Sequence, residues 1–323
     1  MATPKSANCN SARLLRYKCA AHVLKQFGLS GKLKRPQNAS LTEVFFVEDK
    51  FILRARALND SVIENFNYEQ KVLSIVSPIF EINLQINFPC PILSTAGEKF
   101  VIYQNRFWTV YPRINGTILG NWYEIDLATN ETNDFLLREL RKLHYKSRNV
   151  ASGSLIRRNF LLDTLAPLLP VCASLLSSQA SQRLNEAFNS TKKFYSSYPD
   201  TESVFVHGDY HHGNVLVNSD MQIIALLDLD WCRFGHRIDD LAFSVMMFLR
   251  TQKRSPSDIS WNEILLSLNT YDANISTGEL DQIKDCIILY GALDLAMFSQ
   301  AYSERAQFWA KYQLPFLESL CRM

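Results

Sequence analysis

The sequence predicts an α+β fold, with a small antiparallel sheet first and mostly helices after it. Up to residue 112, short apolar segments alternate with turn residues, as is typical of antiparallel strands. Beyond residue 113, most segments place apolar residues at helical spacing. A chain of 323 residues is long enough for two lobes, and the break in pattern after residue 112 divides it into 1–112 and 113–323.

The composition excludes several classes of protein. A hydrophobic content of 47% with 20% charged residues is typical of a globular chain, and a net charge of +2 gives no electrostatic basis for nucleic-acid binding. No apolar run approaches the roughly 18 residues that span a bilayer, and the N-terminus lacks a signal-peptide core. Seven scattered cysteines without a Cys-x-x-Cys pair fit reduced thiols. We therefore expect a cytoplasmic protein without a nucleic-acid or membrane partner.

In the N-terminal part, we expect two helices and four strands. Gly28 suits the C-terminal cap of the first helix, and Ser61 with Glu64 forms a capping box at the start of the second. The predicted elements are helix 11–27, strands 42–47 and 51–55, helix 61–76, and strands 99–104 and 107–111.

In the C-terminal part, the pattern predicts helices around one β-hairpin. The hairpin has apolar strands 215–217 and 223–227 on either side of a polar turn at 218–220. The predicted helices are 134–144, 160–176, 181–198, 238–250, 257–268, 277–290 and 292–320.

The stretch that indicates function is His-Gly-Asp-Tyr-His-His-Gly-Asn at 207–214. Asp228 follows Asn214 by fourteen residues, on the far side of the hairpin. An acid at 209, a carboxamide five residues on and a second acid beyond a hairpin are in the order in which kinases place a catalytic base and two magnesium ligands. Phosphoryl transfer requires a group that orients the acceptor hydroxyl and hard oxygen ligands that hold Mg²⁺ against the phosphates. The stretch therefore predicts a kinase that uses ATP and Mg²⁺.

Together with Leu-Asp-Leu-Asp-Trp at 227–231 and Asp-Leu-Ala at 240–242, this stretch resembles the aminoglycoside phosphotransferase and choline kinase family. That family is related to the protein kinases and includes homoserine kinase-like members. The resemblance implies a bilobal protein-kinase-like fold, with a nucleotide-binding N-terminal lobe and a helical C-terminal lobe that carries the catalytic loop and the acceptor site. It further implies that Asp209 is the catalytic base, that Asn214 and Asp228 are magnesium ligands, and that Asp240 supports the catalytic loop.

The resemblance also implies nucleotide-binding residues in the N-terminal part. Arg54 lies where many members carry a cation that reaches the phosphates, and Arg56, on the same strand face, is an alternative. Glu69 either pairs with that cation or is a surface charge on its helix. The basic segment 31–40 lies where the family has its phosphate loop, but its single glycine and Pro36 leave a solvated loop as an alternative. The hinge candidates for main-chain contacts with adenine are Val110, Tyr111 and Ile114.

The remaining polar residues of the motif have supporting roles in this interpretation. We expect the ring of His207 to hold the loop by hydrogen bonding, and Asp230 is a candidate contact for a second magnesium ion or its water shell. His211 and His212 are candidates to face the acceptor or phosphate, with surface exposure as the alternative. These histidines lack the helical pair and the further Cys or His ligands of a zinc site, which disfavours zinc.

We therefore expect a phosphotransferase that moves the γ-phosphate of ATP to a hydroxyl of a small molecule. The resemblance favours a homoserine-like or choline-like amino alcohol, with an aminoglycoside after these. A protein Ser/Thr kinase of the same fold stays open, although no Ala-Pro-Glu segment lies between Asp228 and Asp240 to form a peptide-docking platform. A catalytically weak nucleotide-binding regulatory protein also stays open, because the segment 31–40 is poor in glycine.

Overall fold

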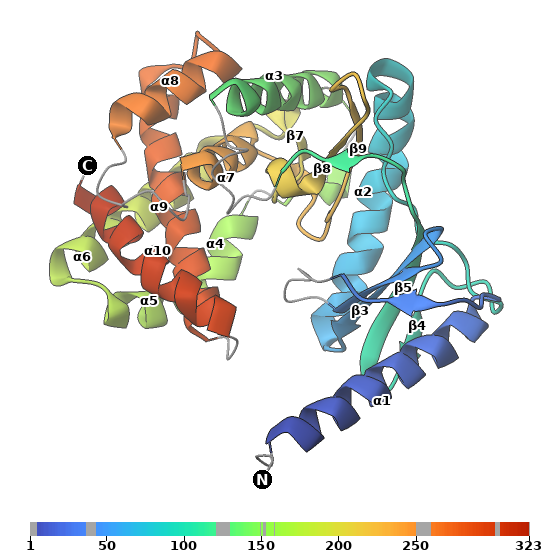
Figure 1. Cartoon of the computed structure of the whole chain (residues 1–323). Coiled ribbons are helices and arrows are strands. Elements are labelled where there is room, and N and C mark those ends of the chain that lie inside the picture. Colours follow the sequence, from blue (N-terminus) through green and yellow to red (C-terminus); the bar gives the residue numbers. More distant parts are fainter. Residues whose placement is uncertain are drawn as a thin grey trace. The chain divides into compact units, whose positions relative to one another are not determined.

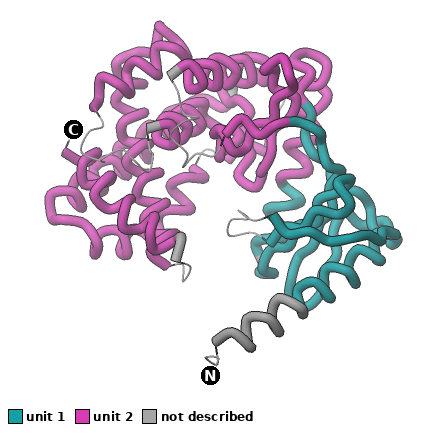
Figure 2. Tube along the Cα trace, in the orientation of Figure 1, with its two compact units in different colours: residues 1–68, 87–116 teal, residues 69–86, 117–323 magenta. Residues whose placement is uncertain are grey.

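The computed structural model describes residues 5–36, 43–120, 130–148, 150, 153–157, 159–249, 260–300 and 304–322. The chain forms two compact units, of which the first comprises residues 1–68 and 87–116 and the second residues 69–86 and 117–323 (Figures 1 and 2). An antiparallel sheet dominates the first unit and helices dominate the second, which confirms the predicted α+β class.

The first unit contains a five-stranded antiparallel sheet with the strand order β1-β2-β3-β5-β4. The two predicted hairpins are present, and their turns place Glu48 and Asp49, and then Gln104 and Asn105, at positive φ. The basic segment 31–40 is not entirely a loop, because β1 lies within it; residues 37–40 fall outside the described residues. The strands are β1 (Leu33–Lys34), β2 (Glu43–Val47), β3 (Phe51–Ala57), β4 (Val101–Tyr103) and β5 (Arg106–Pro112).

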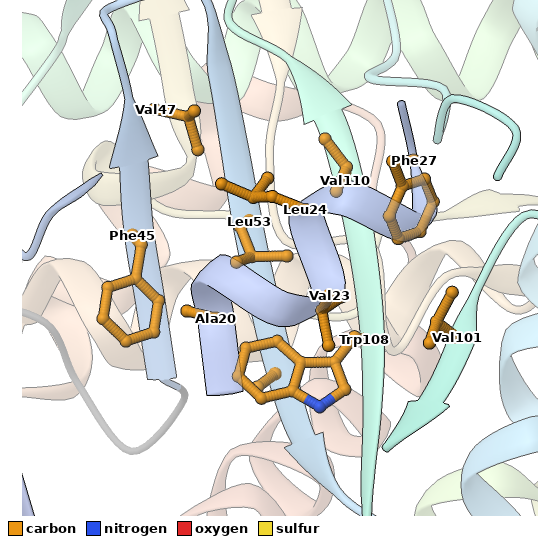
Figure 3. Close-up of a cluster of buried hydrophobic side chains, with 11 residues drawn as sticks. Ala20, Val23, Leu24, Phe27, Phe45, Val47, Leu53, Val101, Trp108 and Val110 are labelled. Atoms are coloured by element: carbon orange, nitrogen blue, oxygen red, sulfur yellow. The ribbon is translucent and has the colours of Figure 1, made fainter. Parts of the chain in front are cut away.

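Helix α1 (Lys5–Gln26) covers one face of this sheet (Figure 3). Buried residues of the helix recur three or four positions apart, so they form one apolar stripe. Alternate residues of the strands point at this stripe because side chains alternate across a strand. The buried cluster consists of Ala20, Val23, Leu24, Phe27, Phe45, Val47, Leu53, Ala55, Val101, Trp108 and Val110.

Helix α2 (Asp60–Leu84) is longer than the predicted helix 61–76 and passes from the first unit into the second. The side chain of Asn59 accepts a hydrogen bond from the Val62 amide at 2.9 Å, so the cap is Asn59, and the predicted capping box at Ser61 and Glu64 is wrong.

Short strands of the second unit frame the 207–214 stretch. Strands β6 (Thr117–Ile118), β8 (Val215–Val217) and β9 (Ile223–Leu226) form one antiparallel sheet in the order β6-β8-β9. Strands β7 (Val204–Val206) and β10 (Arg233–Gly235) form a second antiparallel pair, which the sequence analysis missed. Each of these two strands has only three residues, all buried, so no alternation of polar and apolar residues marks them.

Helices make up most of the second unit. The predicted helix 160–176 is wrong as a single element, because a 3₁₀ turn at Ala166–Leu168, which contains Pro167, divides it into α4 and α5. The predicted break at residue 291 is also wrong, since α9 continues through Gly291. A Cβ there would lie 3.3 Å from Gln313 Nε2, so the glycine permits close packing of α9 on α10. The helices are α3 (Asn130–Ser147), α4 (Phe160–Leu165), α5 (Leu169–Leu175), α6 (Ser178–Ser197), α7 (Arg237–Leu249), α8 (Trp261–Tyr271), α9 (Thr277–Ser299) and α10 (Glu304–Arg322).

Across the described residues, none of the helices has both the length and the apolar composition that a bilayer span requires.

Candidate active site

The hairpin β8–β9 brings Asp228 beside Asn214. Val215 opposes Leu226 in the antiparallel register, and the Leu227 amide donates a hydrogen bond to the Asn214 carbonyl at 2.8 Å. Asp228 is the next residue, and it is exposed in the left-handed backbone region with φ of 56°. An aspartate tolerates this conformation better than a β-branched residue does. The hairpin therefore places Asp228 next to the end of the 207–214 stretch.

The side chain of Asn214 fixes Asp209. Asn214 Nδ2 donates to both the main-chain carbonyl and Oδ2 of Asp209, each at 2.8 Å. The ring of His211 lies on the other oxygen, with Nε2 at 3.4 Å from Asp209 Oδ1, while its Nδ1 accepts the Gly213 amide at 3.0 Å. The Asp209 side chain keeps 29% of its surface exposed. The carboxylate is thus oriented by its neighbours and remains accessible to a ligand, and the amide oxygen of Asn214 is the atom left for a metal ion.

Asp240, from the first turn of α7, holds the start of the same stretch, here called the catalytic loop (207–214). Its fully buried carboxylate accepts the amides of His207 and Gly208, both at 2.6 Å. Its Oδ2 also lies 3.2 Å from His144 Nε2, and His144 Nδ1 lies 2.7 Å from the Tyr271 hydroxyl. Burial opposes the charge of Asp240, but its hydrogen bonds with His144 and the Gly208 amide lower its pKa below the ordinary value. The carboxylate is therefore ionised at neutral pH.

The ring of His207 closes the loop on itself. His207 is fully buried, and its Nδ1 accepts the Asp209 amide at 3.2 Å. Burial lowers the pKa of His207 below 6.5, so the ring is neutral and Nδ1 is available as an acceptor. The His207 ring therefore fixes the main chain at Asp209.

Gly208 lies where a side chain does not fit without strain. Its φ is +84°, in the region that glycine occupies without cost, and a Cβ atom there would lie 2.5 Å from the Trp231 carbonyl oxygen. The main chain that follows Asp228 therefore packs directly against the catalytic loop.

The predicted alternative of surface exposure is wrong for His211 and His212, because both are buried. The ring of His212 packs edge-on against Phe248, with centroids 5.0 Å apart. Burial and the neighbouring His211 lower the pKa of His212 to about 4, so that ring is neutral at physiological pH.

Glu69 and Asp230 both belong to the second unit. Glu69 is only 5% exposed, so the predicted alternative of a surface charge is wrong. Cys232 is buried, and burial raises the pKa of its thiol, with the charges of Glu69 and Asp230 adding to the effect. Both carboxylates therefore lie within electrostatic reach of Cys232. A pairing of Glu69 with Arg54 stays a prediction.

The other nucleotide candidates belong to the first unit. Arg54 lies on β3, where it opposes Thr109 of β5. The guanidinium of Arg56, the alternative to Arg54, lies over the Phe107 ring, with Cζ 5.0 Å from the centroid. The carbonyl of Val110 accepts the Ile92 amide at 2.9 Å. Tyr111 is buried near the end of β5, and Ile114 follows that strand.

The sequence analysis missed a buried polar network in the second unit. Arg233 Nη2 pairs with Asp239 Oδ2 at 2.6 Å, and Asp239 also accepts a hydrogen bond from the Tyr195 hydroxyl. Tyr195 lines a cavity of about 310 Å³ together with Gly153, Ile156, Asn159, Ser196 and Asp200. Only the acid at 239, next to Asp240, gave a local signal, and an acid in a first helical turn has the ordinary explanation of the helix dipole.

Metal-binding capacity in the site rests on oxygen atoms. The described ranges contain no group of three or more His, Cys, Asp and Glu side chains arranged to hold a metal ion. The carboxamide oxygen of Asn214 and the carboxylate of Asp228 are hard donors of the kind that Mg²⁺ accepts, and Mg²⁺ takes most of its remaining ligands from water and phosphates.

Comparisons with known proteins show the family and the fold. Residues 34–268 match the family model described as the phosphotransferase enzyme family. No curated protein sequence matches the chain. Among solved structures, a microcompartment-associated aminopropanol kinase shares 18% identity with a TM-score of 0.67, covering 94% of this chain and 95% of that one.

Two further solved structures extend the comparison. APH(2")-IIia, in a complex with GDP and kanamycin, shares 15% identity with a TM-score of 0.63 and covers 95% of this chain and 98% of its own. The amicoumacin kinase hAmiN, in complex with AMP-PNP, Ca²⁺ and Ami, shares 14% identity with a TM-score of 0.61 and covers 99% and 96%. At these identities the likeness shows the fold, and the predicted kinase-like fold is confirmed.

Proposed function

The chain belongs to the phosphotransferase enzyme family, and from this premise we propose that it uses ATP and Mg²⁺ to phosphorylate a hydroxyl group of a small amino alcohol. The observation that carries the proposal is the arrangement around Asp209. Asn214 and His211 orient both of its oxygens, the side chain stays accessible, and Asp228 is presented beside Asn214. An oriented, accessible acid next to two oxygen ligands is what transfer of a phosphoryl group to a hydroxyl requires.

In the proposed mechanism, Asp209 receives the acceptor hydroxyl as a hydrogen-bond donor. The acceptor oxygen attacks the γ-phosphorus as the bond from that phosphorus to the β–γ bridging oxygen breaks. The hydroxyl proton passes to Asp209, and the products are a phosphate monoester and ADP. Asn214 keeps the carboxylate in place during this transfer, because its Nδ2 holds Oδ2 and the main-chain carbonyl of Asp209 together.

Asn214 and Asp228 fit the magnesium ion, and when bound the ion neutralises charge on the phosphates. Asp240 holds the catalytic loop in the geometry that the transfer requires, through the amides of His207 and Gly208. Arg54 is proposed to contact the polyphosphate and to pair with Glu69. The hinge candidates Tyr111 and Ile114 are proposed to contact adenine through their main chains, and Val110 less directly, since its carbonyl already accepts the Ile92 amide.

An amino alcohol is the proposed acceptor for two reasons. The aminopropanol kinase, a structural neighbour, carries such a compound in its name. In this chain Asp209 lies within the loop and Asp228 lies beside its last residue, Asn214, and an ammonium group on the acceptor is attracted to such acids. Homoserine-like and choline-like compounds and aminoglycosides all satisfy this description. We place the activity in the cytoplasm, which fits ATP as donor and the unpaired thiols of Cys19, Cys90, Cys172, Cys232, Cys286 and Cys321.

The test is ATP consumption by the purified protein with Mg²⁺, across amino alcohols, amino-free sugars, aminoglycosides and a mixture of Ser/Thr peptides. We expect turnover that depends on a compound carrying both an amine and a hydroxyl, and that stops when EDTA removes the metal. Turnover only on peptides would instead establish a protein kinase. Nucleotide binding without turnover on any acceptor would contradict the proposal and favour a regulatory protein.

A further inference from the structure

The segment that follows Asp228 turns back onto the catalytic loop, and a buried ion pair holds it there. We propose that Arg233 and Asp239 are positioning residues, which fix the catalytic loop by holding the Trp231 carbonyl against Gly208. The expected effect of this pair on turnover rests on the proposed function, but its expected effect on the loop conformation does not.

The side chain of Arg233 is almost completely enclosed. It is 1% exposed, and Asp239 is fully buried. Arg233 Nη2 pairs with Asp239 Oδ2 at 2.6 Å and donates to the Tyr290 hydroxyl at 3.3 Å, while Nη1 donates to the Trp231 carbonyl at 3.1 Å. The two donors sit on one rigid planar group, so the position of Asp239 dictates the position of the Trp231 carbonyl.

An aromatic stack adds to this restraint. The guanidinium carbon of Arg233 lies 4.7 Å from the centroid of the Phe160 ring. That ring meets Trp231 edge-on, with centroids 5.4 Å apart. Trp231 is therefore held at its main chain by Arg233 and at its side chain by Phe160, which Arg233 also contacts.

The restraint reaches the catalytic loop at Gly208. The Trp231 carbonyl comes so near to Gly208 that a Cβ atom there would lie 2.5 Å from it. In addition, the main chain of Arg233 pairs with Val206 in the β7–β10 register, one residue before the loop begins. Both the side chain and the main chain of Arg233 therefore restrain the start of the loop.

Two successive acids of α7 thus hold the loop by two routes. Asp240 accepts the amides of His207 and Gly208 directly, while Asp239 acts through Arg233 and Trp231. Stability alone does not explain the second arrangement, because a buried ion pair is often no more stabilising than apolar residues of similar volume. The explanation that fits the contacts is geometric: the pair fixes where the main chain after Asp228 meets the loop.

The test compares wild-type protein with Arg233→Met/Asp239→Leu by hydrogen–deuterium exchange of peptides covering 204–216. We expect the His207 and Gly208 amides to exchange about tenfold faster in the double variant, at a temperature where both proteins are folded. The melting temperature falls as well, because the Tyr195 and Tyr290 hydroxyls lose partners. With the best acceptor found for the wild type, we expect kcat to fall by roughly 10- to 100-fold and KM for ATP to change less than about twofold.

The matched control is Arg183→Met/Asp285→Leu, which removes a 2.6 Å ion pair between α6 and α9 of the same unit. It should leave the loop exchange and kcat unchanged. If the first double variant does not fold, Arg233→Lys decides, because a single ammonium retains the charge but lacks the rigid fork. Folded variants whose loop exchanges at the wild-type rate would overturn the proposal. A protein without turnover on any acceptor would refute the proposed function while leaving the exchange result to test the positioning.

Discussion

Replacing Gly208 by alanine introduces both backbone strain and a clash with the Trp231 carbonyl, and comparison with a second glycine separates the two effects. A residue with a Cβ at positive φ costs roughly 1–2 kcal/mol. At Gly208 the added Cβ also lies 2.5 Å from the Trp231 carbonyl oxygen, well inside the 3.4 Å at which ordinary contact begins, so the carbonyl has to move by almost an ångström. Overpacking of this kind adds about 1–3 kcal/mol. We therefore expect Gly208→Ala to lose roughly 2–5 kcal/mol of unfolding free energy.

Gly97→Ala is the matched control, because Gly97 has nearly the same φ, +85°, with no atom within 4 Å of the added Cβ. It should lose only the strain, about 1–2 kcal/mol, and keep its turnover. Gly208→Ala should lose about 100-fold in kcat, since a shift near 1 Å at a reacting group has that effect. The measurements are urea unfolding and steady-state kinetics. Equal losses of stability in the two variants, with kcat retained in both, would refute the account of the loop.

Two further predictions concern pH. Asp240→Asn should lower kcat and cost about 1.5–3 kcal/mol at neutral pH, because a buried charged acceptor of two amides is lost. The pKa of Asp240 is lowered in the folded state, so its contribution is present above about pH 4 and lost as the pH falls through the folded value. The melting-temperature gap to the wild type should close in acid, and a constant gap would count against an ionised Asp240. Burial lowers the pKa of His236 to about 3 from 6.5, so between these values the unfolded chain binds a proton that the folded chain does not. His236→Asn keeps an acceptor for the Ile238 amide. In that pH window the wild type should lose up to roughly 1.4 kcal/mol of unfolding free energy per pH unit more than the variant, measured by urea unfolding. An equal dependence of unfolding free energy on pH in both proteins would disprove the lowered pKa of His236.

The sequence predicted those features that depend on local pattern. The family resemblance, the phosphotransferase class and the kinase-like fold are confirmed, and all three came from short motifs around residues 207–242. The two N-terminal hairpins were predicted because apolar strands and turn residues alternate there. Pro167 carried a readable signal for the break between α4 and α5, which the helical spacing of the apolar residues outweighed.

Features that depend on contacts between separate elements could not be predicted from the sequence. Gly291 is a helix breaker by propensity, but α10 packs so closely on α9 at this point that a glycine suits the position. Arg233 looked like an ordinary loop residue, because its partners Asp239 and Tyr290 are brought to it by two helices. The burial of Glu69 likewise depends on how the second half of α2 packs in the second unit, which helical periodicity alone does not specify.

The most direct test of the central claim compares Asp209→Asn with Asp220→Asn. Both replace an aspartate by its neutral isostere, but Asp220 lies exposed in the β8–β9 turn, away from the catalytic loop's hydrogen bonds. With the best acceptor and MgATP, Asp209→Asn should lose at least about 100-fold in kcat while its affinity for ATP stays close to that of the wild type, and Asp220→Asn should behave as the wild type. Near-normal turnover by Asp209→Asn would contradict the assignment of this residue as the catalytic base.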